Sequence, residues 1–144
     1  MKRAAIALSL AALAIAGRTP LFAGELSPAW VFPAAGRVAP VRSSPTVYNG
    51  IVYIADDSGK LYGIWAKGRL GGALVPGFPV QLDGAVRGRP AVYGDRGVER
   101  IYVATTKGTL YAYHLDGTAA WSQALGSNVS IVSTPAVRGP YVYV

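Results

Sequence analysis

The 144-residue chain contains no cysteine and a single histidine, His114. The first absence excludes a disulfide framework, a thiolate metal site and a cysteine nucleophile. The second leaves zinc without the nitrogen ligands that it needs when cysteine is missing. A serine-histidine-aspartate triad would have to use His114, with Asp116 as its carboxylate. Because His114 directly follows a strand that we predict over 110–113, we interpret it as a strand-end residue and not as a catalytic base.

Charged residues are also scarce, at 15%, whereas hydrophobic residues make up 51%. This composition is typical of a folded domain and argues against disorder. The formal charge of +7 includes Lys2, Arg3 and Arg18; without them, 14 − 3 = 11 basic residues face seven acidic ones and leave +4. No run of five or more like charges occurs, so we predict no nucleic-acid partner.

The N-terminal segment has the three parts of a secretory signal peptide. Two basic residues precede an apolar stretch over 4–16, which is too short to span a bilayer. Small residues then offer a cleavage site after Ala16 or Ala23. A lipoprotein signal would need cysteine where Arg18 stands, which excludes a lipid anchor by that route. We therefore predict a signal peptide over 1–23 and a periplasmic or secreted protein without a membrane span.

The rest of the chain contains an internal repeat. Pro45, Pro90 and Pro135 are 45 residues apart (90 − 45 and 135 − 90), and each opens a short apolar run. Each run is followed by a turn and a second strand, predicted over 51–55, 101–104 and 141–144. In the first two copies a glycine-bearing turn and a third strand follow, over 61–65 and 110–113. Repeats of this length, each a small antiparallel sheet, are typical of β-propeller blades.

Local signals in the first copy agree with a meander of strands. Asn49 and Gly50 tolerate positive φ and predict a tight hairpin; the second copy has an inserted polar segment instead, 93–100, which we predict to be an exposed loop. The strand over 51–55 is apolar on both of its alternating faces. Such a strand is buried on both sides, as it would be in a sheet that lies between two similar sheets. The alternative architecture is a β-sandwich with similar strands.

These motifs resemble a known family. The segment 43–65, SSPTVYNGIVYIADDSGKLYGIW, resembles the PQQ-like repeat of quinoprotein-type β-propellers, with its Ser-x-Pro-x-Val, Gly-x-Val-Tyr and Gly-x-Leu-Tyr-Ala-x-Asp elements and a closing Trp. The second copy matches the later part of the pattern better, over 108–121. Trp30 looks like the closing Trp, and hence the last strand, of a preceding blade, and Phe78 stands where the first copy would have its own. The resemblance covers residues from about 30 to 144.

We therefore predict an all-β fold: a β-propeller of four-stranded antiparallel blades, here a partial ring of about two and a half blades within 24–144. Blade A is expected over about 43–82, blade B over about 88–124 and the start of blade C over about 131–144. A closed ring needs about four to eight blades, and the sequence stops within a strand pattern. We therefore expect the chain to be the N-terminal part of a longer protein; the alternative is a short form that assembles with copies of itself.

The resemblance implies two classes of function. The first is an exported, non-enzymatic binding or scaffolding module of the cell envelope, similar in repeat type to scaffolding proteins of outer-membrane assembly, with proteins or envelope components bound through the blade loops. The alternative is the N-terminal part of a PQQ- and calcium-dependent alcohol or sugar dehydrogenase. Such enzymes use a carboxylate base, Glu and Asn metal ligands and often a vicinal cysteine pair, whereas this chain has only Asn49 and Asn128 as Asn. We predict the first function and no cofactor for this chain.

A third possibility is an adhesin or pilus-associated propeller of the FG-GAP-like type, which the Gly-Phe-Pro-Val segment over 77–80 resembles. Such propellers often carry calcium loops, and the segment 95–99 has too few oxygen ligands for one. The remaining polar motifs fit turns, since Asp, Ser and Gly are the residues that turns require: 56–59, 83–84 and 116–117. We interpret the recurring aromatic residues as packing residues: Trp30, Tyr53, Tyr62, Tyr102, Tyr111 and Trp121. Gly71 and Gly72 lack the strand-to-helix setting of a phosphate loop. We predict no catalytic, cofactor-binding or metal-binding residue.

Overall fold

The structure, a computed structural model, describes residues 28–32, 38–95 and 97–144. It confirms the all-β fold, with two four-stranded antiparallel sheets and one two-stranded sheet. The first sheet consists of β1 (Thr46–Tyr48), β2 (Ile51–Ala55), β3 (Lys60–Trp65) and β4 (Val80–Gln81), in that order. The second consists of β5 (Ala91–Asp95), β6 (Val98–Ala104), β7 (Thr109–His114) and β8 (Ala119–Ala124), and the third of β9 (Ala136–Arg138) and β10 (Tyr141–Tyr143).

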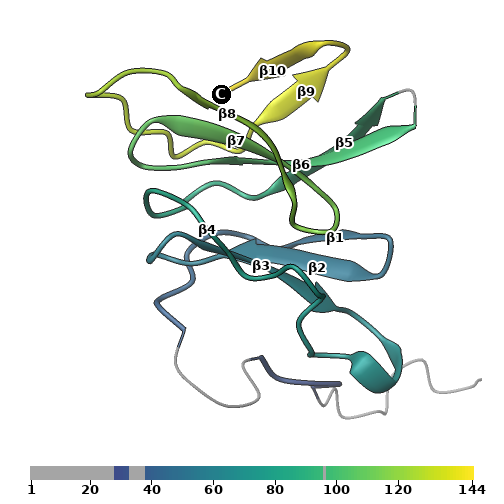
Figure 1. The fold of residues 1–144 in the computed structure, drawn as a ribbon. Coiled ribbons are helices and arrows are strands. Elements are labelled where there is room, and N and C mark those ends of the chain that lie inside the picture. Colours follow the sequence, from purple (N-terminus) through teal and green to yellow (C-terminus); the bar gives the residue numbers. More distant parts are fainter. Residues whose placement is uncertain (1–27, 33–37, 96) are drawn as a thin grey trace, which may run out of the picture.

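The sheets are stacked in chain order, with the first in blue, the second in green and the third in yellow (Figure 1). A short 3-10 helix, η1 (Gly68–Leu70), lies in the connection from β3 to β4. Among the described residues, no helix has the length and hydropathy that a transmembrane segment requires. The predicted signal peptide, with its cleavage sites, lies outside the described residues.

The strand boundaries follow from proline and glycine. Each of the three repeated prolines directly precedes the first residue of β1, β5 or β9, where its missing N–H removes no ladder hydrogen bond. The predicted hairpin turn is confirmed, since Asn49 has φ 46° and Gly50 has φ 76°. Gly59 and Gly108 end the next turns at φ 81° and 78°. These positive values are the left-handed conformation that a hairpin loop needs before its second strand.

The prediction of an exposed loop over 93–100 is wrong. β5 and β6 continue through this segment, with Tyr93 opposite Arg100 and Gly94 opposite Glu99. The insertion therefore lengthens a hairpin instead of forming a loop. Polar residues can do this because a two-stranded ribbon that extends beyond its sheet satisfies its backbone hydrogen bonds without needing apolar side chains. As a result, Glu99 and Arg100 lie in a strand, and their side chains point to opposite faces.

The main hydrophobic core lies between the first and second sheets. The side chains of Tyr53 and Ala55 on β2 are fully buried there, as are those of Ile101 and Val103 on β6. Phe78, from the connection before β4, packs on Tyr53 with ring centroids 5.9 Å apart. The facing sides of the first and second sheets thus cover each other, as expected for stacked blades.

The other face of the first sheet has a different cover. Val52 and Ile54 are half-buried, and Trp30 and Phe32 lie over this face, lining the same cavity as both residues. The ring of Phe32 is 5.3 Å from that of Tyr62. The prediction that Trp30 lies in the last strand of a preceding blade is wrong, because residues 28–32 contain no strand.

Backbone hydrogen bonds outside the strands connect successive sheets at matching positions. The N–H of Val86, which leads into the second sheet, donates to the carbonyl of Asp56 in the first, at 3.5 Å. The N–H of Ile131, 45 residues later, donates in the same way to Thr105 at 3.3 Å. Each bond joins the segment that leads into a sheet to the turn between the second and third strands of the preceding sheet. Because the two bonds lie at matching positions, successive sheets are attached in the same way.

Candidate functional site

The candidate site is a cleft between the second sheet and the β9–β10 hairpin, with a volume of about 400 Å³. We call it the Arg100 cleft. Its lining combines aromatic and aliphatic side chains with one charged residue, Arg100. The lining residues from the second sheet are Tyr93, Val98, Arg100, Tyr102 and Trp121, and those from the hairpin are Val137, Gly139, Pro140 and Val142.

Arg100, in the second sheet, occupies the position that corresponds to a core-facing residue of the first sheet. Ala104 and Ala55 each end the second strand of their sheet, and four residues before them stand Arg100 (104 − 4) and Ile51 (55 − 4). Ile51 belongs to the core between the sheets and is 9% exposed. Arg100 is half-buried, and its Nε is buried without a hydrogen-bond partner among the described residues. A buried donor without an acceptor destabilises a fold.

The aromatic wall of the cleft repeats an arrangement from the main core. The rings of Tyr102 and Trp121 are 6.0 Å apart at 57°, and those of Tyr53 and Phe78 are 5.9 Å apart at 55°. Phe78 therefore does take the place that Trp121 has in the second copy. Phe78 is 8% exposed, whereas Trp121 is 38% exposed. The same pair of rings is thus covered between the first two sheets and open beside the third.

The missing cover can be identified from the first interface. There, Tyr113 of β7 is buried in the core and Leu115 packs against it. Both come from the third strand of the second sheet or from the turn after it. Among the described residues the third sheet has only two strands. The Arg100 cleft therefore corresponds to the space that a third strand fills in the first interface.

A second cavity of about 380 Å³ lies on the outer face of the first sheet, under Trp30 and Phe32. Its lining carries no charged side chain, and its hydroxyl-bearing residue, Tyr62, donates to Asp56 Oδ2 at 2.8 Å. Trp30 Nε1 is also satisfied, by the carbonyl of Ala66 at 2.9 Å. The polar groups of Trp30 and Tyr62 are therefore both paired within the described part of the chain. The lining residues are Trp30, Phe32, Val38, Val41, Pro45, Val52, Ile54, Tyr62 and Ile64.

Asp56, the first residue of the turn motif 56–59, is fully buried. Its Oδ1 accepts hydrogen bonds from the Ser58 N–H at 2.9 Å, the Ser58 hydroxyl at 2.7 Å and the Lys60 N–H at 3.0 Å. Burial would raise the pKa of Asp56, but these bonds and the one from Tyr62 outweigh it and hold the pKa below its usual value. Both carboxylate oxygens thus serve the turn and the strand beside it.

Asp57, in contrast, forms ion pairs, one of which links the first sheet to the connection that leads into the second. It lies 3.5 Å from Arg42 Nε and pairs with Arg87, which belongs to the connection into the second sheet. In the second copy, Thr105 stands where Asp56 is, and the carboxylate comes from the preceding connection. Asp83 accepts from the hydroxyls of Thr105 at 2.7 Å and Thr109 at 2.6 Å. The sequence repeat could not show this exchange, because Asp83 lies outside the aligned positions.

Among the described residues no hydrogen bond joins His114 to Asp116, the two residues of the conceivable triad. His114 is half-buried at the end of β7. Asp116 accepts from the N–H and the hydroxyl of Thr118, at 2.9 and 2.7 Å, and these bonds lower its pKa. The described residues contain no group of three or more His, Asp or Glu side chains that could hold a metal ion together.

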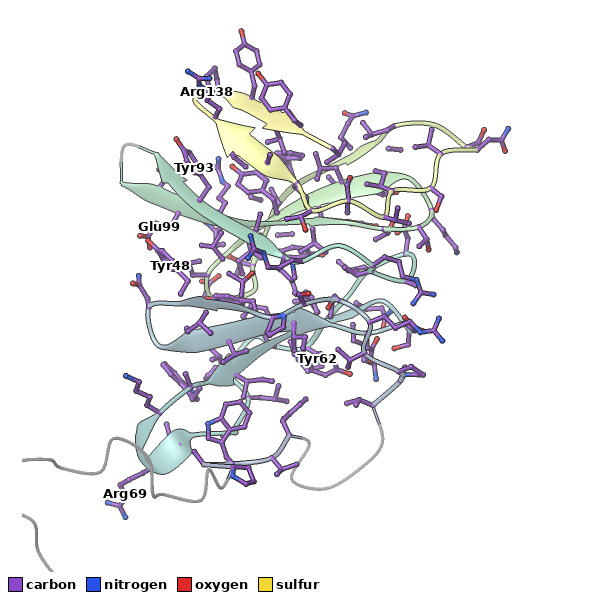
Figure 2. All side chains as sticks on the ribbon, turned by 180° about the vertical axis from the view of Figure 1, so that it is seen from behind. Tyr48, Tyr62, Arg69, Tyr93, Glu99 and Arg138 are labelled. Atoms are coloured by element: carbon purple, nitrogen blue, oxygen red, sulfur yellow. The ribbon has the colours of Figure 1, made fainter. Side chains whose placement is uncertain are left out.

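Two tyrosines join the first and second sheets. Tyr48 of β1 donates its hydroxyl hydrogen bond to Glu99 of β6, and Figure 2 shows these two side chains meeting at one side of the stack. The hydroxyl of Tyr53 donates to the Leu115 carbonyl at 3.3 Å, and burial raises its pKa to about 12. Sequence reasoning missed the Tyr48–Glu99 pair because Glu99 lies in the segment that was predicted to be a loop.

Comparison with known proteins supports the fold. No family model matches the chain, and no curated protein does. Among solved structures, the chain is similar to BamB from Moraxella catarrhalis, a PQQ-like β-propeller protein, with 21% sequence identity and a TM-score of 0.50. The match covers 60% of this chain and 25% of that one. At this identity the likeness shows the fold: stacked four-stranded sheets arranged as in a propeller.

Proposed function

We propose that the protein is an exported, non-enzymatic β-propeller of the PQQ-like repeat type that binds other proteins as a scaffolding module in the cell envelope. The observation that carries this proposal is the propeller-like fold, in which the chain is similar to BamB. The secretory pattern of the leader supports it further. Trp121, which lines the Arg100 cleft, is 38% exposed, and aromatic residues are enriched at protein-binding surfaces.

The carboxylates support a binding role over catalysis. The side chains of five acidic residues accept hydrogen bonds or ion pairs from the protein's own groups: Asp56, Asp57, Asp83, Glu99 and Asp116. A general base or a calcium ligand needs carboxylate oxygens that are free to face a substrate or ion. In the described part of the chain these five carboxylates hold the fold together instead.

The proposal is tested in cells that produce the protein. A photo-crosslinking amino acid is placed at Trp121 in the cleft and, as a control, at Lys60, the exposed first residue of β3. We expect adducts with another protein from position 121 in the envelope fraction, and few from position 60. Adducts of equal yield from both positions, or a protein retained in the cytoplasm, would contradict the proposal.

A second experiment tests the dehydrogenase alternative directly. The purified protein is incubated with PQQ and Ca²⁺, and dye reduction is followed with short alcohols and sugars. We expect no turnover above the rate of PQQ alone. Substrate-dependent dye reduction that disappears with a calcium chelator would replace the scaffold proposal with the enzyme.

A further inference from the structure

We propose that two copies of the chain associate through β8, which pairs antiparallel with β8 of the second copy about a two-fold axis at Gln123. The side of β8 that faces away from β7 is called the β8 edge. The inference goes beyond the proposed binding function and does not depend on the Arg100 cleft. It rests on the backbone groups of the β8 edge, on a contrast with the first sheet and on the order of residues in the strand.

The β8 edge carries backbone groups that β7 does not pair. Leu125, directly after β8, donates its N–H to the Gly108 carbonyl at 2.8 Å. Because the two directions alternate along an antiparallel strand, the backbone groups of Gln123 also face β7, whereas those of Ser122 and Ala124 face away. In the described part of the chain β8 pairs only with β7. The Ala124 carbonyl accepts from the side-chain Nε2 of Gln123 at 2.9 Å, so a donor can reach it from outside the sheet.

The matching edge of the first sheet is blocked by proline. Val80 pairs with the second residue of β3, and Gln123 pairs with the second residue of β7. The residues before them, Pro79 and Ser122, therefore occupy matching places. Pro79 has no N–H to donate to an added strand, whereas Ser122 has one. None of the described residues that follow β4 pairs with its outer edge, so an open outer edge is a property of a sheet inside the stack.

β8 also lacks the other features that protect edge strands, which are charged side chains, short length and bulges. It has six residues, against two in β4, and the sequence contains no charged residue over 117–137. Its irregularity of register lies opposite Ala112 and Tyr113, at the start of the strand. Residues 121–124 pair regularly with β7 and are exposed. They form a regular, uncharged template for an added strand.

The order of the residues fits a second copy of the same strand. With the axis at Gln123, Ser122 of each copy lies opposite Ala124 of the other, and the two residues exchange both of their backbone hydrogen bonds. The two Gln123 amides lie opposite each other, where each can donate and accept. Trp121 lies opposite Leu125 of the other copy, an aromatic–aliphatic pair, and no like charges meet. A strand of another protein could make the backbone bonds but not, in general, this match of side chains.

The first test is sedimentation equilibrium of the purified protein over a range of concentrations, in which we expect a monomer–dimer equilibrium. Ser122→Pro gives the β8 edge the residue that the first sheet has there, and the N–H that it removes faces away from β7. Each dimer loses about two backbone hydrogen bonds, so the dissociation constant should rise about thirtyfold. Gln123→Lys should raise it as well, most at low ionic strength, because two ammonium groups then lie opposite each other. Gln81→Lys, the same change on the exposed end of β4, should leave it unchanged.

Disulfide trapping tests the register, since the chain has no cysteine of its own. Opposite residues in a non-hydrogen-bonded pair have β-carbons within about 5.5 Å of each other. Gln123→Cys should therefore form a covalent dimer under mild oxidation with copper phenanthroline. Ala119→Cys is the control in the same strand. The register places residue 119 opposite residue 127 (123 + 123 − 119), so the two introduced cysteines lie about 26 Å apart, eight residues at about 3.3 Å each, and should not cross-link.

Three results would overturn the inference: a monomer at every concentration, a dimer that neither Ser122→Pro nor Gln123→Lys weakens, or equal disulfide yields from the two cysteine variants. Thermal unfolding monitors whether the variants fold. Gln123→Lys changes only an exposed side chain, so it carries the test if Ser122→Pro does not fold. Failure of the inference leaves the proposed binding function intact, because a cross-link between two copies has twice the mass of the chain and is distinguished from an adduct with another protein.

Discussion

The ring of Phe78 lies directly on the backbone of Gly63. A β-carbon built on Gly63 would be 2.7 Å from Cδ2 and 2.8 Å from Cε2 of that ring, closer than carbon atoms approach. In the second sheet Ala112 pairs with Trp121 at the matching place. The close approach in the first sheet thus depends on glycine, and it brings Phe78 into the core between the two sheets.

This contact predicts the effect of Gly63→Ala. A glycine-to-alanine change in a strand ordinarily stabilises a protein slightly, because it reduces the freedom of the unfolded chain. Here the methyl group would push Phe78 out of its packing, and we expect a loss of about 2 kcal/mol in the free energy of unfolding, measured in urea. The loss should shrink when Phe78→Leu is combined with it. An unchanged or higher stability would show that the ring is not confined.

A second prediction concerns the connection to the third sheet. A β-carbon on Gly88 would lie 2.1 Å from the carbonyl oxygen of Ser133, and because the contacting atoms are backbone atoms they cannot move aside as a flexible side chain would. We expect Gly88→Ala to detach the β9–β10 hairpin, so that the amide of Tyr143, which is opposite Ala136 in a hydrogen-bonded pair, loses its protection in hydrogen exchange while that of Tyr53 keeps it. Gly94→Ala is the control, since its β-carbon would meet only the flexible Glu99 side chain at 3.0 Å. Retained protection at Tyr143 in Gly88→Ala would contradict the structure.

The Tyr48–Glu99 contact can be followed by titration. The hydrogen bond to Glu99 is the main reason why the pKa of Tyr48 is raised above 10, whereas burial is the main reason for the pKa of about 12 at Tyr53. Glu99→Gln should therefore return the pKa of Tyr48 toward its ordinary value and leave that of Tyr53 well above 10. Carbon-13 labelling of tyrosine and a pH titration by nuclear magnetic resonance measure both. If the two values fall together, the assigned causes are wrong.

Stability should decrease in acid because of Asp56 and Asp83, whose pKa values are lowered in the folded protein. A group with a lowered folded pKa stabilises the fold above its unfolded pKa, about 3.9 for Asp, and loses this effect as pH falls through the folded value. Unfolding in urea at pH 7, 4 and 2.5 measures the decrease. Asp56→Ala should cost about 3 kcal/mol at pH 7, because it leaves several donors of the turn without an acceptor. Its stability should also fall less between pH 4 and pH 2.5; an equal fall in variant and parent would exclude Asp56 as a cause.

Much of the fold could be predicted from the sequence. The positions of Pro45, Pro90 and Pro135 predict where each sheet starts, because proline is tolerated directly before a first strand. Their equal spacing indicates that the sheets are built from repeats of similar length. Asn49, Gly50 and Gly59 identify turns through the conformations they allow. The prediction was wrong at two places where no proline or glycine signal applies. The segment around Glu99 is an extended hairpin and not a loop, and the segment that carries Trp30 is not a strand.

The candidate site could be predicted only in part. The aromatic residues were interpreted as packing residues, and Tyr53 and Tyr102 do pack on Phe78 and Trp121. The role of Arg100 was missed because its segment was interpreted as a loop. Only in a strand do side chains alternate between two faces, so a loop assignment gives no prediction of which residues point toward the next sheet. The replacement of Asp56 by Asp83 in the second copy was also missed, because hydrogen bonds between distant positions leave no periodic pattern.

By itself, the sequence determined the strands, the turns and the repeat, because these depend on backbone preferences and on the alternation of side chains within a few residues. Only the tertiary structure decided which faces are covered and which remain open. That choice depends on how whole sheets stack, and it turns Ile51 into a core residue and Arg100, at the matching position, into the one charged residue of a cleft.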